Sequence, residues 1–98
     1  MSKFLILWEM DTCRIPENPE EQMALFTRLM NMVREDFKIG LVDWGEFAGG
    51  QAGYAISEGT EQEIALALMK YSPYVMFVMH PVLSASQVEE NMKALSQA

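Results

Sequence analysis

The pattern of apolar and polar positions along the chain predicts four β-strands. The runs Lys3–Met10 and Tyr74–His80 are apolar at nearly every position, which is typical of strands covered on both faces. Two mixed runs, Ile39–Phe47 and Gln51–Ser57, flank a turn at Ala48–Gly50. Glycine supplies the positive φ that a tight turn needs, so we predict a β-hairpin here. The first strand divides into two faces, with Phe4, Ile6 and Trp8 on one and Leu5, Leu7 and Glu9 on the other.

Three stretches carry the start signals of α-helices. Asn18–Glu21 combines a capping residue, a proline at the first helical position and an acidic residue where a capping box needs one. Thr60–Glu63 and Ser86–Glu89 are capping boxes that open a second and a third helix. The three predicted helices end near Phe37, Tyr71 and Leu95.

Residues at spacings of three and four predict the buried side of each helix. In the first helix these are Gln22, Phe26, Leu29, Met30, Val33 and Phe37, and the other side carries mainly Arg28, Asn31, Glu35 and Asp36. In the second helix they are Ile64, Leu68 and Tyr71, and in the third Val88, Met92 and Leu95.

The element order β-α-β-β-α-β-α predicts the topology, because crossovers are right-handed. It gives an α+β, ferredoxin-like βαββαβ(α) domain spanning residues 1–98, with a four-stranded antiparallel sheet. Numbered along the chain, its strands would lie in the order 4-1-3-2, with the first two helices on one face. The other face would expose an apolar patch larger than monomers usually carry. We therefore expect a homodimer in which two open faces pack together; the alternative is that the third helix folds back over this face.

Composition narrows the classes of partner. Ninety-eight residues form one domain, and the net charge of −7 would repel nucleic-acid phosphates and anionic membranes. No apolar run approaches the ~20 residues of a membrane span, and Met1–Lys3 lead directly into a strand. We therefore expect a cytoplasmic protein without a signal peptide. The single cysteine, Cys13, excludes an internal disulfide and a Cys-x-x-Cys metal pair, and we expect neither a cofactor nor a metal.

Three segments resemble one uncharacterised family of short proteins. They are Trp8 at the end of the first strand, the hairpin segment Glu46–Tyr54, and Pro81–Leu83 after the last strand. This family is similar to the dimeric α+β barrel superfamily, so the resemblance implies ferredoxin-like subunits and a dimer. The superfamily includes cofactor-free monooxygenases, muconolactone-isomerase-like enzymes, haem-dependent enzymes and proteins of no known activity. Family members often carry a histidine near the hairpin, where this chain has Glu46.

His80, the single histidine, is a candidate general base, metal ligand or haem ligand at a strand end. The alternative is a strand-end residue with a satisfied hydrogen bond. Antiparallel pairing predicts that its neighbours are Lys3, Lys38 and Glu58. Because Glu9 and Glu46 would lie at the opposite rim, we expect no metal site that joins them to His80 within one subunit.

Two further groups of polar residues are candidates for chemistry. Glu9, Asp11 and Glu46 could form a paired-carboxylate site for acid–base work, or they could be solvated strand ends. Cys13 lies beside Arg14, whose charge favours a reactive thiolate, but no second cysteine or histidine is near it in the sequence.

The aromatic residues of the strands are candidates for a ligand pocket between two sheets, or for the core of a dimer. They are Trp8, Trp44, Tyr54 and Tyr74. No lysine–serine pair and no helix start follows the glycines at 45, 49, 50 and 53, so these are interpreted as turn glycines and not as a phosphate loop.

Three functions stay open at this point. The first is a homodimeric structural or binding module that holds a small apolar ligand, or none, between its two sheets. The second is a cofactor-independent enzyme for a small hydrophobic substrate. In it, either His80 or the pair Glu9 and Glu46 at the opposite rim of the sheet would transfer protons. The third is a subunit whose open sheet face binds another protein.

Overall fold

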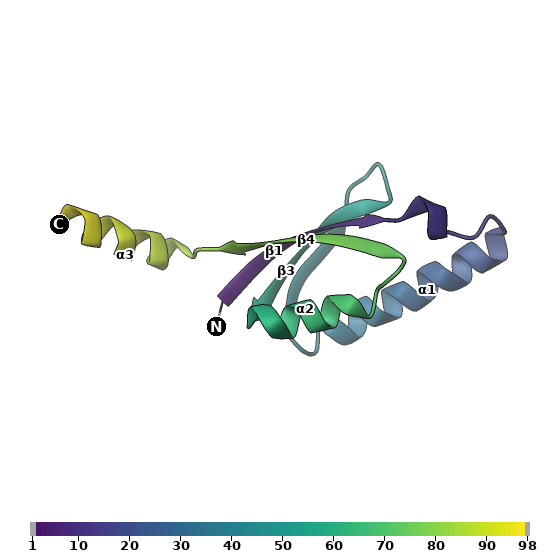
Figure 1. The fold of residues 1–98 in the computed structure, drawn as a ribbon, viewed down its shortest axis with the longest axis horizontal. Coiled ribbons are helices and arrows are strands. Elements are labelled where there is room, and N and C mark those ends of the chain that lie inside the picture. Colours follow the sequence, from purple (N-terminus) through teal and green to yellow (C-terminus); the bar gives the residue numbers. More distant parts are fainter. Residues whose placement is uncertain (1, 98) are drawn as a thin grey trace.

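The computed structural model describes residues 2–97 and contains the predicted strands and helices in the predicted order. The strands are β1 (Ser2–Met10), β2 (Leu41–Glu46), β3 (Ala52–Gly59) and β4 (Val75–Val82). The helices are α1 (Pro19–Asp36), α2 (Glu61–Met69) and α3 (Ala85–Ser96), and a short 3₁₀ turn, η1 (Thr12–Arg14), follows β1 (Figure 1). The α+β class is confirmed. Within residues 2–97, no helix has the length and apolar character needed to cross a membrane.

The four strands form one antiparallel sheet in the order β2-β3-β1-β4, which is 4-1-3-2 read from the opposite edge. β1 lies inside the sheet, where Trp8 is opposite Gly53 of β3 and Phe77 of β4. The pairing of β2 with β3 shifts register between Leu41 and Asp43, which leaves one extra residue on β2. Because β2 and β4 are the outer strands of this order, they form the two edges of the sheet.

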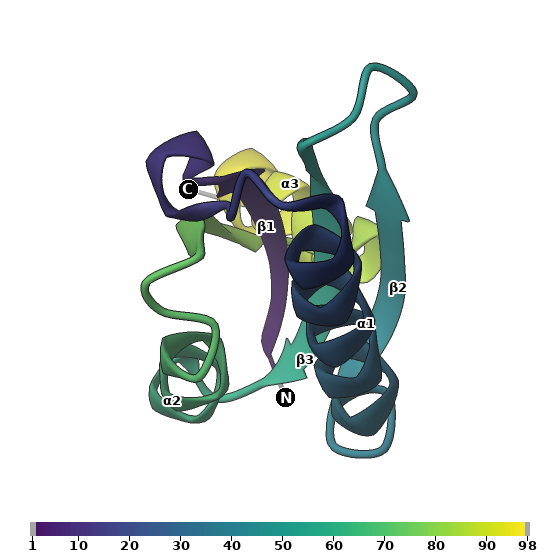
Figure 2. The same ribbon diagram turned by 90° about the vertical axis from the view of Figure 1, so that its right-hand side faces the viewer.

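Helices α1 and α2 cover the same face of the sheet (Figures 1 and 2). On that face Phe4, Ile6 and Trp8 expose only 3%, 1% and 7% of their surface. Trp8 packs against α1, whereas Phe4 and Ile6 pack against Ile64 of α2. The α1 residues in this core are Leu25, Leu29 and Val33. The predicted division of β1 into two faces is thus confirmed.

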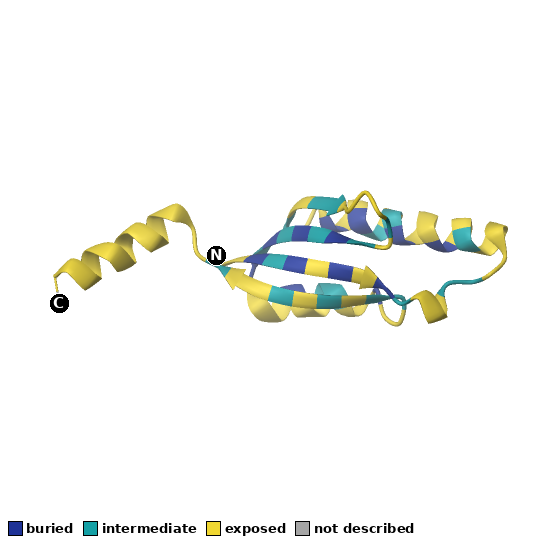
Figure 3. Ribbon diagram, turned by 90° about the horizontal axis from the view of Figure 1, so that it is seen from above, coloured by how far each residue is buried: buried dark blue, intermediate teal, exposed yellow. Residues whose placement is uncertain are grey.

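The opposite face of the sheet, which we call the open face, is not covered by any described element (Figure 3). There Leu7, Met76 and Val78 expose 39%, 51% and 56% of their surface. The register aligns Leu7 with Tyr54 and Val78, so apolar side chains form a row across three strands. The open face consists of Leu5, Leu7, Tyr54, Ile56, Met76, Val78 and His80, with polar residues at its ends.

Helix α3 does not fold back over the open face. It continues beyond the end of β4 and projects from the body of the molecule (Figure 1), whose longest extent is 62 Å. Every residue of α3 is exposed. The alternative in which this helix covers its own sheet is therefore not what the structure contains.

The buried side of α1 is rotated relative to the prediction. Leu25 is buried, whereas Phe26 and Phe37, which were expected in the core, expose 36% and 47% of their surface. Asp36 was expected on the polar side and is only 8% exposed. The reason is that side chains following α2 bind the Asp36 carboxylate, so a polar residue can complete the buried stripe.

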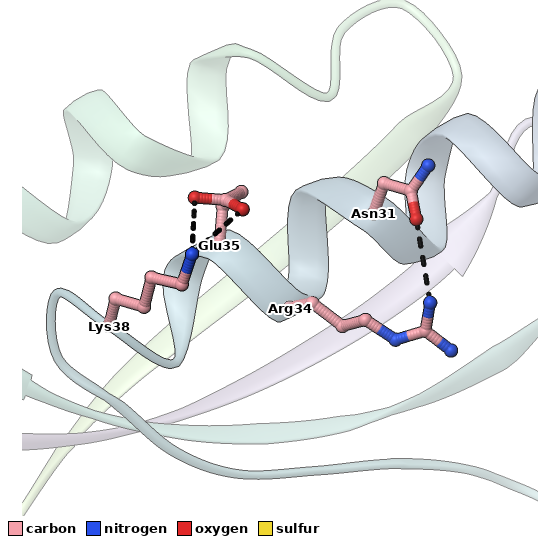
Figure 4. A network of polar contacts seen from close by, with 4 residues as sticks. All are labelled: Asn31, Arg34, Glu35 and Lys38. Atoms are coloured by element: carbon pink, nitrogen blue, oxygen red, sulfur yellow. Dashed lines mark hydrogen bonds and ion pairs between the residues drawn. The ribbon is translucent and has the colours of Figure 1, made fainter.

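The outward side of α1 carries two polar pairs (Figure 4). Lys38 Nζ lies 3.1 Å from Glu35 Oε1, and Arg34 Nη1 donates a hydrogen bond to Asn31 Oδ1 at 3.5 Å. All four side chains are exposed, so water competes for each contact and the pairs add little stability.

The last strand is longer than predicted. β4 continues past His80 and Pro81 to Val82. Because β4 is an edge strand, one side of its backbone has no neighbour, and a proline without an N–H is tolerated there.

The cap of α3 lies two residues earlier than predicted. The Ser84 hydroxyl accepts a hydrogen bond from the Gln87 N–H at 3.2 Å, and Gln87 Oε1 accepts one from the Ser84 N–H at 2.8 Å. The capping box is therefore Ser84–Gln87 and not Ser86–Glu89, because glutamine can fill the same role as glutamate.

Candidate ligand cavity

A buried carboxylate joins the ends of the two covering helices. Asp36 is the last residue of α1, and its Oδ2 accepts a hydrogen bond from the Tyr71 hydroxyl at 2.6 Å. Its Oδ1 is paired with the Lys70 ammonium, which directly follows α2. Both carboxylate oxygens are therefore bound by side chains from a segment 34 and 35 residues further along the chain. We call these three residues the Asp36 cluster.

The local fold explains why this cluster forms. Lys70 is the C-cap of α2, where the helix dipole favours a positive charge. Asp36 ends α1, where the dipole disfavours a negative charge, so the nearby ammonium compensates for it. Tyr71 is held in the next turn by a hydrogen bond from its N–H to the Leu68 carbonyl at 3.1 Å.

The Tyr71 hydroxyl is held in its neutral form. Burial of the side chain raises the pKa of Tyr71 well above its usual value, and the hydrogen bond to Asp36 and the Asp36 charge raise this pKa further. The ring also makes an edge-to-face contact with Phe77 of β4, with 5.6 Å between centroids. Tyr71 is thus a neutral hydrogen-bond donor whose position between the helices and the sheet is fixed.

A cavity of about 510 Å³ adjoins the Asp36 cluster, between α2, the start of β2 and strand β3. This volume lies within the range of small-molecule sites, which are mostly apolar with a few converging polar groups. Its apolar walls include Leu41, Trp44, Ala55, Ile64, Ala67 and Leu68. Its polar groups include the Asp36 cluster and Ser57, which is 9% exposed.

A second cavity of about 300 Å³ lies under α1, and Trp44 and Tyr71 line both cavities. Trp44 stacks on Trp8 with 5.3 Å between ring centroids and an interplanar angle of 7°. The Trp8 Nε1–H donates to the Gly45 carbonyl at 3.2 Å. The two indoles are therefore fixed against each other, and Trp44 lines both cavities whereas Trp8 lines only the second.

Two of the four hairpin glycines leave space for aromatic rings and do not take part in the turn. A Cβ at Gly53 would lie 2.1 Å from the Gly45 oxygen and 2.6 Å from the Trp8 ring. A Cβ at Gly45 would lie 2.5 Å from the Tyr54 ring. The interpretation of both as turn glycines is wrong, since they lie within β3 and β2. Gly50, with φ of 86°, does belong to the turn, where its N–H donates to the Phe47 carbonyl at 2.8 Å.

The structure distributes the predicted aromatic residues over separate places. Trp8 and Trp44 lie on the helix side. Tyr54 lies on the open face, where its hydroxyl donates to Asp43 Oδ2 at 2.9 Å; this bond, partial burial and the Asp43 charge raise the pKa of Tyr54. The Tyr74 ring lies 5.2 Å from the Arg28 guanidinium. Of these four aromatic residues, only Trp8 and Trp44 line either of the two cavities.

The predicted carboxylates do not converge within one chain. Glu9 pairs with Ala52 and Met76, which places it on the open face, whereas Glu46 pairs with Gly53 and faces the helix side. Asp11 caps η1 by accepting a hydrogen bond from the Cys13 N–H at 3.1 Å. A paired-carboxylate site of Glu9, Asp11 and Glu46 is therefore not formed in the subunit.

His80 is exposed on the open face, opposite Leu5. Lys3 lies two positions from Leu5 along β1 and is aligned with Glu58, whose Oε1 is 3.9 Å from the Lys3 Nζ. Lys3 and Glu58 therefore lie at the same end of the sheet as His80, as predicted. Lys38 instead pairs with Glu35 at the end of α1. Whether His80, Glu9 or Glu46 takes part in catalysis stays a prediction.

Sequence reasoning missed the Asp36 cluster. The signal was present in the spacing, because Leu29, Val33 and Asp36 continue one helical stripe in steps of four and three. An acidic residue that completes an apolar stripe needs a partner, and the partner could not be identified from the helix alone.

Comparisons with known proteins do not narrow the function. The chain matches no protein-family model and no curated protein. Among residues 2–97, no three histidine, cysteine, aspartate or glutamate side chains are arranged to hold a metal ion.

Proposed function

We propose that this chain is a small-molecule-binding module that works as a homodimer of ferredoxin-like subunits, of the dimeric α+β barrel type. The observation that carries the binding proposal is the cavity of about 510 Å³ beside the Asp36 cluster. It combines apolar walls, a rigid indole and a small number of fixed polar groups, which is the usual composition of a ligand site.

The cluster and its surroundings suggest the ligand chemistry. The Lys70 ammonium uses one contact on Asp36 and is 39% exposed, so it can donate to a second acceptor. Glu63 also lines the cavity, and its carboxylate is held by the Thr60 hydroxyl at 2.8 Å. Because Asp36 and Glu63 outweigh Lys70 in charge, a neutral acceptor such as a carbonyl or hydroxyl fits better than an anion. The ligand is an apolar or aromatic molecule with one such group.

The open face supports the dimeric part of the proposal. Leu7, Met76 and Val78 form a contiguous apolar surface that the subunit leaves exposed. Two sheets that pack face to face would remove this surface from water, as in other sandwiches. The ligand cavity lies on the other side of the sheet and would stay accessible in such a dimer.

The binding proposal is tested with prodan, a neutral naphthyl ketone whose emission shifts to the blue in apolar surroundings. Wild-type protein should bind it, and filling the cavity with Ala67→Leu should weaken the binding at least tenfold. Ala65→Leu is the matched control, because Ala65 is exposed on the same helix and is not part of the cavity wall. Equal binding by the two variants would refute the site. Native mass spectrometry of freshly purified protein would show whether a ligand copurifies.

The dimer is tested separately by light scattering over a range of protein concentrations. A mass of twice 11.1 kDa is expected in the micromolar range. A monomer at every concentration would refute the dimer and leave the cavity proposal standing.

A further inference from the structure

We infer that α3 is an exchanged arm: in the proposed homodimer, the α3 of each chain packs on the second copy. The inference rests on the proposed dimer, and it adds the segment that completes the interface. It starts from two apolar surfaces of one chain that do not meet each other, the open face and the apolar side of α3.

The first observation is the apolar stripe of α3. Val88, Met92 and Leu95 expose 44%, 65% and 78% of their surface, and their spacing of four and three places them on one side of the helix. Ala85 precedes them on the same side. Leu83, in the connection to β4, is also 59% exposed. Four large apolar side chains in or beside one short segment thus lie in water in the isolated subunit.

The second observation is that α3 lacks support for its own fold. It has 12 residues, and isolated helices of this length are marginal in water. The Ser84–Gln87 capping box stabilises its first turn but cannot replace tertiary packing. A helix of this kind is stable when its apolar side is covered.

The third observation excludes the parent subunit as the cover in this structure. Only Leu83 and Ser84 connect β4 to α3, and the helix runs on beyond the end of the strand (Figures 1 and 3). Its stripe therefore lies outside the footprint of its own sheet, where a second copy can reach it.

The area of the open face alone is small for a stable dimer, and the arm would enlarge it. With strands about 4.8 Å apart and a rise of about 3.3 Å per residue, four strands of eight residues present roughly 500 Å². Two such faces bury roughly 1,000 Å² in total, which is below the roughly 1,600 Å² of a standard interface. An arm about 18 Å long and 10 Å wide adds roughly 180 Å² on each surface it joins, and two arms bring the total to about the standard size.

The geometry of packed sheets indicates where the arm lies. Two twisted sheets stack at an angle, so corners of each face stay uncovered. A helix that leaves the sheet beyond the end of β4 is placed to cover such a corner on the partner. A two-fold axis makes the contact reciprocal, so each chain both gives and receives an arm.

The test compares two glutamate substitutions on α3. Met92→Glu places a carboxylate in the apolar stripe, whereas Ala94→Glu places one on another side of the same helix and is the matched control. Dimer dissociation constants are measured by sedimentation and light scattering on the full chain. We expect Met92→Glu to raise the constant by roughly a hundredfold, because the change occurs twice in a symmetric dimer, and Ala94→Glu to change it less than about threefold. Leu95→Glu, which alters the same apolar stripe, should resemble Met92→Glu.

Each outcome decides a different point. A wild-type chain that is monomeric throughout refutes the dimer of the proposed function and the arm with it. A tight wild-type dimer that Met92→Glu and Leu95→Glu leave unchanged refutes the arm alone. If Met92→Glu lowers the thermal stability equally at all concentrations and leaves dimerisation intact, α3 packs on its own subunit and the inference is overturned.

Discussion

The two faces of the sheet are formed by similarly apolar strand sequences, but their side chains are buried to different extents. In β1, Ile6 is 1% exposed under the helices, whereas its neighbour Leu7 is 39% exposed on the open face. The helix side also contains both cavities and the indole stack. Neither of the two cavities and neither indole lies on the open face, whose described residues form an exposed apolar surface. The same sheet therefore has one side that is closed by helices over a core with two cavities, and another side whose apolar residues stay exposed in the subunit.

The largest effect expected from this difference separates Ile6 from Leu7. Ile6→Ala should lower the free energy of unfolding by about 2–4 kcal/mol, because it leaves a void in a closed core. Leu7→Ala should cost less than about 1 kcal/mol when the chain is dilute and monomeric, since water already reaches the side chain. Urea unfolding at low and high protein concentration measures both. Equal losses for the two variants in dilute protein would mean that the faces do not differ in packing.

The hairpin glycines provide a second comparison of the faces. Gly53→Ala should cost about 1–3 kcal/mol, because its Cβ would meet the Gly45 backbone oxygen and the buried Trp8 ring. Gly45→Ala should cost less, because the Tyr54 ring that it meets lies on the open face and can move aside. Gly49→Ala, with no neighbouring atom within 4 Å, is the control and should be close to neutral. Thermal unfolding of the three variants gives the order, and an inverted order for Gly53 and Gly45 would contradict this assignment.

The two hydrogen-bonded tyrosines distinguish the faces by pH. The pKa of Tyr71 is raised first by burial, and that of Tyr54 first by its hydrogen bond to Asp43. A raised native pKa gives stability that is complete below the unfolded value of about 10 and is lost as the pH rises from there through the native value. Tyr71→Phe should therefore flatten the alkaline loss of stability, and at neutral pH it should cost about 1 kcal/mol because Asp36 Oδ2 loses its donor.

Tyr54→Phe should change the alkaline profile less, because its ring lies at the surface and solvent screens the contact. Chemical unfolding at pH 7 and at several values above pH 10 measures both variants. A steeper alkaline decline in Tyr71→Phe than in wild type would mean that the tyrosine does not lose stabilising contacts when it ionises.

The smallest effect is expected at the outward side of α1. Lys38→Ala removes an ion pair whose side chains are 69% and 66% exposed, and it should change the free energy of unfolding by about 0.3 kcal/mol (Figure 4). Added salt should reduce even this difference. A loss above about 1 kcal/mol would show that the pair is better shielded from solvent than the structure indicates.

The sequence pattern was sufficient for the elements and for the faces of β1. The apolar run Lys3–Met10, whose side chains point to opposite faces in turn, and the capping signals at Asn18 and Thr60 are local, so they can be interpreted without knowing the neighbours. The side that Asp36 takes could not be read this way, because it depends on Lys70 and Tyr71 far along the chain.

The candidate site was less accessible to prediction than the fold. Glu9 and Glu46 are near one end of the sheet, but the pairing of β2 and β3 decides that they face opposite sides. A shift of one residue in a register exchanges the faces, and local sequence carries no measure of that shift. The role of Gly53 likewise depends on the Trp8 ring, which lies over it from another strand.

The two edges of the sheet limit how these molecules can associate. On β4, Pro81 cannot donate a hydrogen bond to an incoming strand, and on β2 the extra residue between Leu41 and Asp43 breaks the even spacing that a new strand would need. Growth of the sheet from chain to chain, which is the route to fibrous aggregates, is therefore disfavoured at both ends. The exposed apolar surface of this protein is thus not extended strand by strand, and the face-to-face association proposed above would close after two copies.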